Sequence, residues 1–114
     1  MDKAVEVMKP GIEAEQVHKA VKGELDMRGY SALQIHRTGY SIGLGFAPSW
    51  NEGDILSLRG GEHTKLQPGM TFHIVGATVK IPGEVILSAG SETIIITEDG
   101  NEVLSKIPRK VFVK

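Results

Sequence analysis

Apolar residues recur at helical spacing near the start of the chain. Between residues 13 and 27, the apolar residues that share this spacing are Ala14, Val17, Ala20, Val21 and Leu25. They fall three or four residues apart, with charged residues between them, which predicts an amphipathic helix over residues 13–27. Gly29 is expected to end this helix, because glycine readily adopts the backbone conformation that follows a helix.

A shorter helix is predicted before it, starting almost at Met1. Ala4, Val5 and Met8 suit one helical face, and Pro10-Gly11 ends the segment because proline cannot donate a hydrogen bond to the helix ladder.

Short apolar runs rich in β-branched residues follow the helical part. Strands are predicted at residues 72–79, 85–87, 93–97 and 111–113. The turn residues Glu98-Asp99-Gly100-Asn101 indicate a hairpin, with Gly100 free to take a positive φ. Helices followed by strands predict an α+β fold, and we expect one domain spanning residues 1–114.

Composition excludes several classes of function. The chain has 114 residues with 13 basic and 14 acidic side chains, so its net charge of -1 gives no support for a nucleic-acid partner. It contains no cysteine, which excludes thiolate catalysis and cysteine-bound zinc. No apolar run or leader-like segment predicts a membrane partner or secretion, so the expected location is the cytoplasm.

Three phrases behind the helices occur in a defined order: HRTGYSIGLGFAPSW from His36, LQPGMTF from Leu66 and ETIIITEDGNEVLS from Glu92. With VMKPGIEAEQVHKAVKGELDMRGY over residues 7–30, they resemble the C-terminal half of the pita-bread hydrolases, the family of creatinase, Xaa-Pro dipeptidase and methionine aminopeptidase. The resemblance implies two N-terminal helices packed on a mainly antiparallel curved sheet. Complete members carry an additional N-terminal half, related by pseudo-twofold symmetry, that supplies two aspartate metal ligands.

Positions that the resemblance assigns to metal ligands hold other residues here. The family's histidine falls at Tyr40, its next glutamate at Val75 and its last glutamate at Ser91. Glu92 is one residue further on, and one residue in a strand turns a side chain to the opposite face. A bulge of one residue could restore its orientation, but one carboxylate would not hold two ions. Two divalent ions bridged by hydroxide need several carboxylates, so we expect no dinuclear metal site and no cofactor.

The replacements follow a pattern of their own. Residues 37–43, Trp50 and the closing residues 108–114 are similar to the ectoine-hydrolase branch, which acts on a cyclic amidine without the metallopeptidase ion pair. Phe46-Ala47 and Asn51 depart from that branch. The nearest resemblance is therefore to an ectoine hydrolase rather than to a peptidase.

Two histidines are candidates for proton transfer. His36 and His73 lie in phrases that line the family's cavity, and a neutral imidazole there could pass protons near neutral pH. A structural, hydrogen-bonded histidine is the alternative for each. His18 and His63 are expected on the surface.

Four other residues are candidates for ligand binding. Tyr40 could stack on a ligand or fill the space left by a metal, and Arg37 belongs to the same phrase. Trp50 could form a cavity wall or an interface anchor. Glu92 could hold a cationic amidine by charge-assisted hydrogen bonds, or be a solvated strand carboxylate.

A lone half of this fold would expose surface that the other half normally covers. Two copies could pair through a true twofold axis and imitate the whole fold, so a homodimer is predicted. It would place His36, Tyr40, His73 and Glu92 of both copies around one cavity. A separately encoded N-terminal half is the alternative partner.

Three functions remain open at this point. The first is a truncated, degenerate hydrolase homologue that binds a small amino-acid-like or cyclic amidine ligand in the dimer cavity with little or no turnover. The second is a metal-independent hydrolase of a C–N bond, acting alone or with a separate N-terminal half. The third is a non-catalytic interaction module or a gene remnant.

Overall fold

Two helices and seven strands make up the described part of the protein, a computed structural model that covers residues 1–30, 32, 34–44, 54–75, 78–80, 82–83, 86–88, 90–110 and 113. In chain order the elements are α1 (Asp2–Val7), α2 (Ala14–Met27), β1 (Gly39–Ser41), β2 (Ser57–Leu58), β3 (Thr71–Val75), β4 (Thr78–Lys80), β5 (Ile86–Ser88), β6 (Ser91–Ile96) and β7 (Asn101–Val103). Neither described helix is long and apolar enough to cross a membrane.

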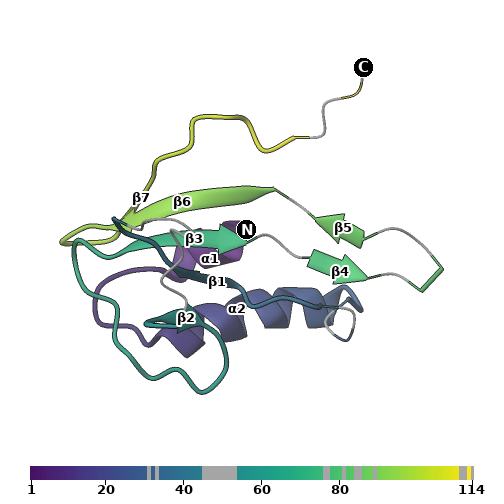
Figure 1. Cartoon of the computed structure of the whole chain (residues 1–114), viewed down its shortest axis with the longest axis horizontal. Coiled ribbons are helices and arrows are strands. Elements are labelled where there is room, and N and C mark those ends of the chain that lie inside the picture. Colours follow the sequence, from purple (N-terminus) through teal and green to yellow (C-terminus); the bar gives the residue numbers. More distant parts are fainter. Residues whose placement is uncertain are drawn as a thin grey trace.

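Five strands form an antiparallel sheet in the order β2-β1-β3-β6-β7, and β4 and β5 pair separately beyond the ends of β3 and β6 (Figure 1). Both helices cover the same face of the five-stranded sheet. Their apolar stripes meet the sheet in one core, whose fully buried members include Met8, Val17, Leu58, Phe72 and Ile94. The α+β class and the packing of two N-terminal helices on a mainly antiparallel sheet are confirmed.

Strand periodicity gives the sheet two different faces. In β3, Phe72 and Ile74 are 0% and 1% exposed and face the helices, whereas His73 between them points the other way. We call the side that the helices cover the helix face and the opposite side the distal face. Because paired residues share a face, the register of β1, β3 and β6 assigns every side chain of these strands to one of the two.

The helix ends follow the sequence closely. The Glu13 side chain accepts a bond from the Gln16 backbone N–H, and the Gln16 side chain accepts one from the Glu13 N–H at 2.9 Å, which together form a capping box at the start of α2. Gly29 has a φ of 74°, as predicted for the residue that ends this helix. At the end of α1, the Asn101 side chain donates to the carbonyl oxygens of Val5 and Met8 at 2.7 and 2.8 Å. A residue near the end of the chain therefore supplies hydrogen bonds to the free carbonyl oxygens at the end of the first helix.

Several strand predictions were wrong in detail. The segment predicted as one strand over residues 72–79 contains two strands in different sheets, β3 and β4. The short strands β1 and β2 were not predicted, because runs of two or three residues carry no usable periodicity. The predicted hairpin joins β6 to β7, but Gly100 is not among the glycines with positive φ. The strand predicted at residues 111–113 lies mostly outside the described residues.

Candidate functional site

The predicted residues Tyr40 and His73 lie side by side on the distal face. Tyr40 in β1 pairs with His73 in β3, and His73 pairs in turn with Thr93 in β6. In the next row of the same face, Val75 pairs with Ser91. The sheet thus gathers side chains from three strands that are far apart in the sequence.

Arg37 joins this group through the aromatic ring of Tyr40. The guanidinium carbon of Arg37 lies 4.6 Å from the centre of the Tyr40 ring, a cation–π contact of about 0.5–1 kcal/mol. The rings of Tyr40 and His73 are 5.2 Å apart between centroids and tilted by 38°. Arg37, Tyr40 and His73, all partly buried, therefore form one stacked cluster, which we call the distal cluster.

His36 lies next to the distal cluster and affects it electrostatically. Its Nδ1 is 2.9 Å from the backbone oxygen of Arg37, and because a carbonyl can only accept, Nδ1 donates and Nε2 faces away from this bond. Burial lowers the pKa of His73 below its ordinary 6.5, and the positive charge of protonated His36 lowers it further. His73 is consequently a neutral imidazole at neutral pH, able to accept a proton.

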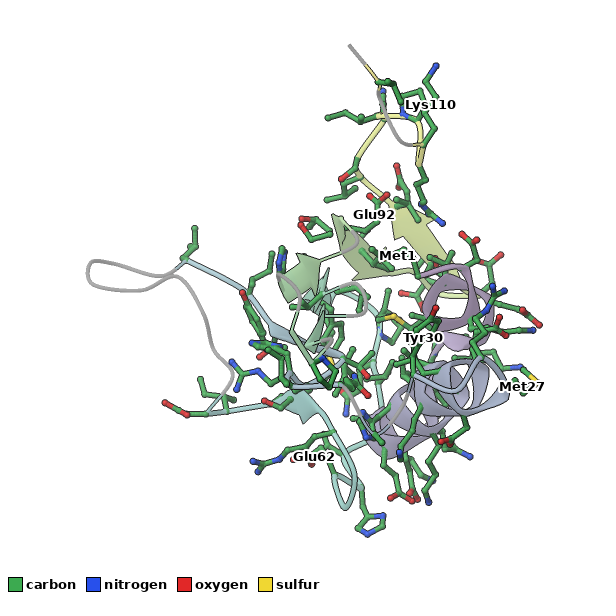
Figure 2. The ribbon with its side chains drawn as sticks, turned by 90° about the vertical axis from the view of Figure 1, so that its right-hand side faces the viewer. Met1, Met27, Tyr30, Glu62, Glu92 and Lys110 are labelled. Atoms are coloured by element: carbon green, nitrogen blue, oxygen red, sulfur yellow. The ribbon has the colours of Figure 1, made fainter. Side chains whose placement is uncertain are left out.

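Glu92 does not lie with the other predicted site residues. It pairs with Ile74 across β3 and β6, so its side chain is on the helix face, where it is 5% exposed. Its Oε1 accepts a bond from Arg109 Nε at 2.9 Å, and Arg109 also contacts Asp2 at the start of α1. Figure 2 shows Glu92 close to Met1 and beneath the segment that ends near Lys110. The expected grouping of Glu92 with His36, Tyr40 and His73 in one cavity is therefore wrong within this chain.

The remaining predicted site residue, Trp50, lies outside the described residues. The sequence did not single out Thr38, which directly follows Arg37: it is 1% exposed, and its hydroxyl is 2.9 Å from Nδ1 of His18 on α2. His18 is half-buried rather than a surface residue as expected, whereas the expectation for His63 holds, since its side chain is 69% exposed.

The burial of His18 predicts a loss of stability in acid. Burial lowers the pKa of His18 below its ordinary 6.5, and the charge of Lys22 adds to the effect while Glu15 opposes it. A depressed pKa stabilises the fold fully above the unfolded value of 6.5, and this contribution is lost as the pH falls through the folded value.

The His18→Gln variant should therefore lose less stability than the wild type between about pH 7 and about pH 5, measured by urea unfolding. His63→Gln is the matched control with the opposite sign, because the hydrogen bond and charges of Glu13 and Glu15 raise the pKa of His63. His63→Gln should steepen the loss in acid. Equal pH dependence in all three proteins would contradict the assignment.

The residues at the positions that the resemblance assigns to metal ligands are poor donors for a divalent ion. Tyr40 offers a phenol, Ser91 a neutral hydroxyl and Val75 no donor at all. Glu92, the adjacent carboxylate, faces the helices and is paired with Arg109. With no carboxylate on this side of β1, β3 or β6, these strands do not supply the several carboxylates that a dinuclear site needs.

Another group of potential metal ligands lies at the start of α2. One donor atom each of Glu13, Glu15 and His63 lie within 4.8 Å of one another. Their contacts are already made within the protein: His63 Nδ1 is 2.9 Å from Glu13, and Glu15 accepts bonds from Lys19 at 2.6 Å and from the Gly61 N–H at 3.1 Å. These hydrogen bonds explain why the three residues lie together: they hold the loop around Gly61 and His63 against the start of α2.

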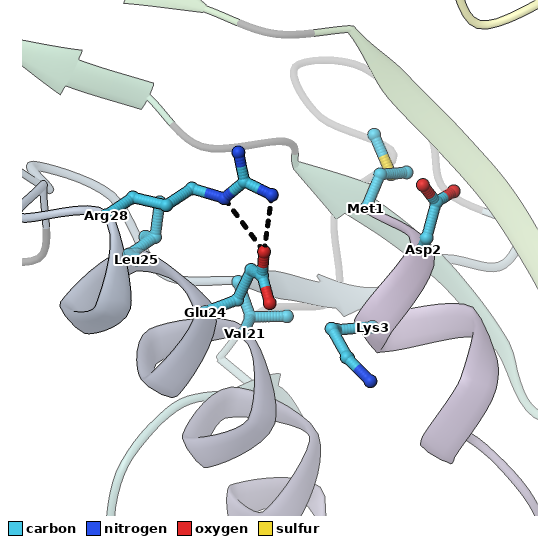
Figure 3. A pocket seen from close by; sticks show the side chains of 7 residues that line it. All are labelled: Met1, Asp2, Lys3, Val21, Glu24, Leu25 and Arg28. Atoms are coloured by element: carbon cyan, nitrogen blue, oxygen red, sulfur yellow. Dashed lines mark hydrogen bonds and ion pairs between the residues drawn. The ribbon is translucent and has the colours of Figure 1, made fainter.

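A pocket of about 320 Å³ opens between the two helices, away from the distal face. Figure 3 shows its lining: Met1, Asp2 and Lys3 from the start of the chain face Val21, Glu24, Leu25 and Arg28 of α2. Its charged groups pair locally, with Arg28 2.7 Å from Glu24 and Lys3 2.7 Å from Glu6. The pocket offers no constellation suited to chemistry.

Comparisons with known proteins agree with this architecture. The model of metallopeptidase family M24 matches residues 1–98. Among curated relatives, the ectoine hydrolase of Halomonas elongata is 38% identical over 115 aligned positions, which cover 100% of this chain and 27% of that protein. The chain thus spans about a quarter of the length of this relative.

Solved structures give the same placement. The dipeptidase PepE of Mycobacterium ulcerans superposes with a TM-score of 0.80 at 27% identity, over 96% of this chain and 28% of PepE. The prolidase of Pyrococcus horikoshii superposes with a TM-score of 0.81 at 28% identity, over 97% of this chain and 30% of the prolidase. These relatives have the pita-bread fold, and this chain matches its C-terminal portion. The chain therefore belongs to metallopeptidase family M24.

Proposed function

We propose that this chain is a hydrolase-like half domain that binds a small amino-acid-like or cyclic amidine molecule on its distal face, with little or no peptidase activity. The observation that carries the proposal is the replacement of the family's ligand positions. Tyr40, Val75 and Ser91 sit together on adjacent strands of one face, yet none of them is a carboxylate or an imidazole. A face that carries other side chains at the positions assigned to metal ligands is suited to binding rather than to metal-assisted hydrolysis.

The proposed partner is a second chain that covers the distal face. Tyr40, His73, Thr93 and Val75 are all only partly buried on this face, and a partner would bury them further. A second copy related by a twofold axis is the favoured occupant, since the two halves of complete relatives are related by pseudo-twofold symmetry. A separate chain that corresponds to the N-terminal half is the alternative.

The oligomeric state tests the pairing. Light scattering coupled to size exclusion should give the mass of a dimer at micromolar protein and again after tenfold dilution. A monomer at both concentrations would contradict the symmetric pairing, and a shift to a heterodimer on adding an N-terminal half from a related protein would favour the alternative partner.

The catalytic part of the proposal is tested separately. Hydrolysis of a glycyl-proline dipeptide should stay at the uncatalysed rate, with and without added Mn²⁺. Turnover that depends on Mn²⁺ would contradict the proposal, because the described part of the distal face would then be holding an ion that its donors do not suit.

A second candidate is a metal-independent hydrolase of a C–N bond, favoured by the electrostatics of His73. Its lowered pKa leaves the imidazole neutral and able to take a proton, and His36 lies near enough to influence that pKa. If this function holds, His73→Ala should abolish turnover of a cyclic amidine such as ectoine. The exposed His63, at the start of α2, provides the control, and its replacement by alanine should leave turnover unchanged.

A further inference from the structure

A buried carboxylate on the helix face is only half satisfied. Glu92 is 5% exposed, and its Oε1 accepts a hydrogen bond from Arg109 Nε at 2.9 Å. Its second oxygen, Oε2, is buried as well and makes no hydrogen bond to any described residue. Both oxygens of a buried carboxylate need donors, because both have lost their bonds to water. One side of the Glu92 carboxylate is therefore open to a further donor.

Arg109 lies against two carboxylates and divides its donors between them. It donates through Nε to Glu92 and through Nη1 to Asp2 at the start of α1. A guanidinium fits a single carboxylate best when two parallel N–H groups meet its two oxygens. Arg109 does not bind Glu92 in this way, since Oε2 stays unpaired. The arginine thus occupies the carboxylates without making every bond that they offer.

The segment that carries Arg109 makes few contacts with the rest of the protein. Residues 104–110 are all exposed, and none of them belongs to a helix or strand. Leu104 donates its backbone N–H to the carbonyl oxygen of Thr93 at 2.9 Å. Within the described part of the chain, residues 105–108 make no hydrogen bond or ion pair with the sheet or the helices. Figure 2 shows the segment rising above Glu92 toward Lys110. Such a segment opens at a low cost in free energy while the core stays folded.

We infer that Glu92 and Asp2 form a binding site for a guanidinium group, which Arg109 plugs from within the chain. When the segment of residues 105–110 moves away, this arginine site accepts the guanidinium of an arginine side chain from another protein. The side chain that occupies the site identifies the class of ligand. The unpaired Oε2 of Glu92 offers an incoming guanidinium a bond that Arg109 does not make. The arginine site lies on the helix face and is independent of the ligand proposed for the distal face.

Chemical rescue of the Arg109→Ala variant tests the arginine site. Methylguanidine is a cation with the planar fork of arginine, and methylurea is its neutral analogue of the same shape. Methylguanidine should bind the variant with a dissociation constant on the order of millimolar. At ten times that concentration it should raise the melting temperature by about 5 °C. Methylurea at equal ionic strength should give no saturable rise. A saturable rise with both probes, or with neither, would overturn the inference.

Two further variants locate the rescue at Glu92. The double variant Arg109→Ala/Glu92→Gln keeps the shape of the site without its buried charge, so it should bind methylguanidine at least about tenfold more weakly. Arg28→Ala is the matched control, because it also frees a carboxylate, that of Glu24, but from an ion pair in which Arg28 is 67% exposed. Methylguanidine should leave its melting temperature unchanged. Equal rescue of Arg109→Ala and either of these variants would overturn the assignment to Glu92.

The wild type tests whether Arg109 is a removable plug, and this measurement does not depend on the folding of any variant. Thermolysin cleaves before exposed apolar residues, and Ile107 in the same segment is 72% exposed. Methylguanidine at about 100 mM should speed cleavage of the Lys106–Ile107 bond at least about threefold, because it competes with a tethered arginine of roughly millimolar effective concentration. The rate is corrected for thermolysin activity on a free peptide. No acceleration, or the same acceleration by sodium chloride, would overturn the inference, since Arg109 would then be a fixed part of the fold or released by screening alone.

Discussion

Replacing Arg109 by alanine is expected to destabilise the protein by about 2–3 kcal/mol, because the Glu92 carboxylate would stay buried without its counter-charge. The Glu92 side chain is 6% exposed, and its Oε1 is held by Arg109 Nε at 2.9 Å. Its other oxygen, Oε2, has no hydrogen-bond partner among the described residues, so the arginine is its main compensation. We place the effect at the lower end for a broken buried pair, since Arg109 is itself 37% exposed.

A double-mutant cycle separates the buried charge from lost packing. Glu92→Gln removes the charge with little change of shape, so the double variant Arg109→Ala/Glu92→Gln should be more stable than Arg109→Ala alone. Arg28→Ala is the surface control. Arg28 pairs with Glu24 one turn away and is 67% exposed, so its loss should cost less than about 0.5 kcal/mol. If Arg109→Ala costs no more than Arg28→Ala in urea unfolding, the Glu92 charge is not compensated by this arginine.

The second large effect is expected at Gly39, where alanine should cost about 3 kcal/mol. A Cβ at this position would lie 2.6 Å from the backbone oxygen of His73, with Leu58 Cδ1 and Ile74 Cδ1 at 3.1 and 3.2 Å. Flexible side-chain ends can shift, but a carbonyl in the middle of β3 cannot move without disturbing its pairing with β1 and β6. The change should also disturb the distal cluster, because Tyr40 is the next residue of β1 and His73 is the residue whose backbone would be displaced.

Gly23→Ala is the matched control of opposite sign. Gly23 lies inside α2, and a Cβ there would meet nothing within 4 Å. Alanine should stabilise the helix by about 0.5–1 kcal/mol, because it reduces the conformational freedom of the unfolded chain. Urea unfolding measures both variants, and a loss of less than about 1 kcal/mol for Gly39→Ala would mean that β1 and β3 can separate at little cost.

The sequence pattern alone was sufficient to predict a feature that depends on a single helix or strand. The stripe of apolar residues in α2 predicted both the helix and the side that it buries, and Gly29 marked its end. The short strands β1 and β2 could not be predicted in this way, because two or three residues are too few to show the alternation of side chains that marks a strand. β1 is a strand because β3 offers it hydrogen-bonding partners, and β2 is a strand because it pairs with β1, which is a tertiary property in both cases.

The candidate site divides in the same way. His36, Arg37, Tyr40 and His73 could be selected from the sequence because they occupy recognisable phrases, and residue identity alone led to the prediction that the family's metal ligands are replaced. The position of Glu92 could not be settled there, because a bulge of one residue would have reversed its face. The structure has an unbroken register between β3 and β6, so Ser91 takes the distal face and Glu92 the helix face.

The sequence by itself determined the family, the amphipathic helix and the chemical character of the replaced ligand positions, since each depends on residue identity and near neighbours. Only the tertiary structure decided which side chains meet. The pairing of β1 with β3 brought Arg37 and Tyr40 to His73, and Arg109, far along the chain, came to lie on Glu92 and Asp2. The physical reason is that side chains alternate between the two faces of a strand, and the face that is buried is decided by the neighbouring strands and by the helices that pack on the sheet.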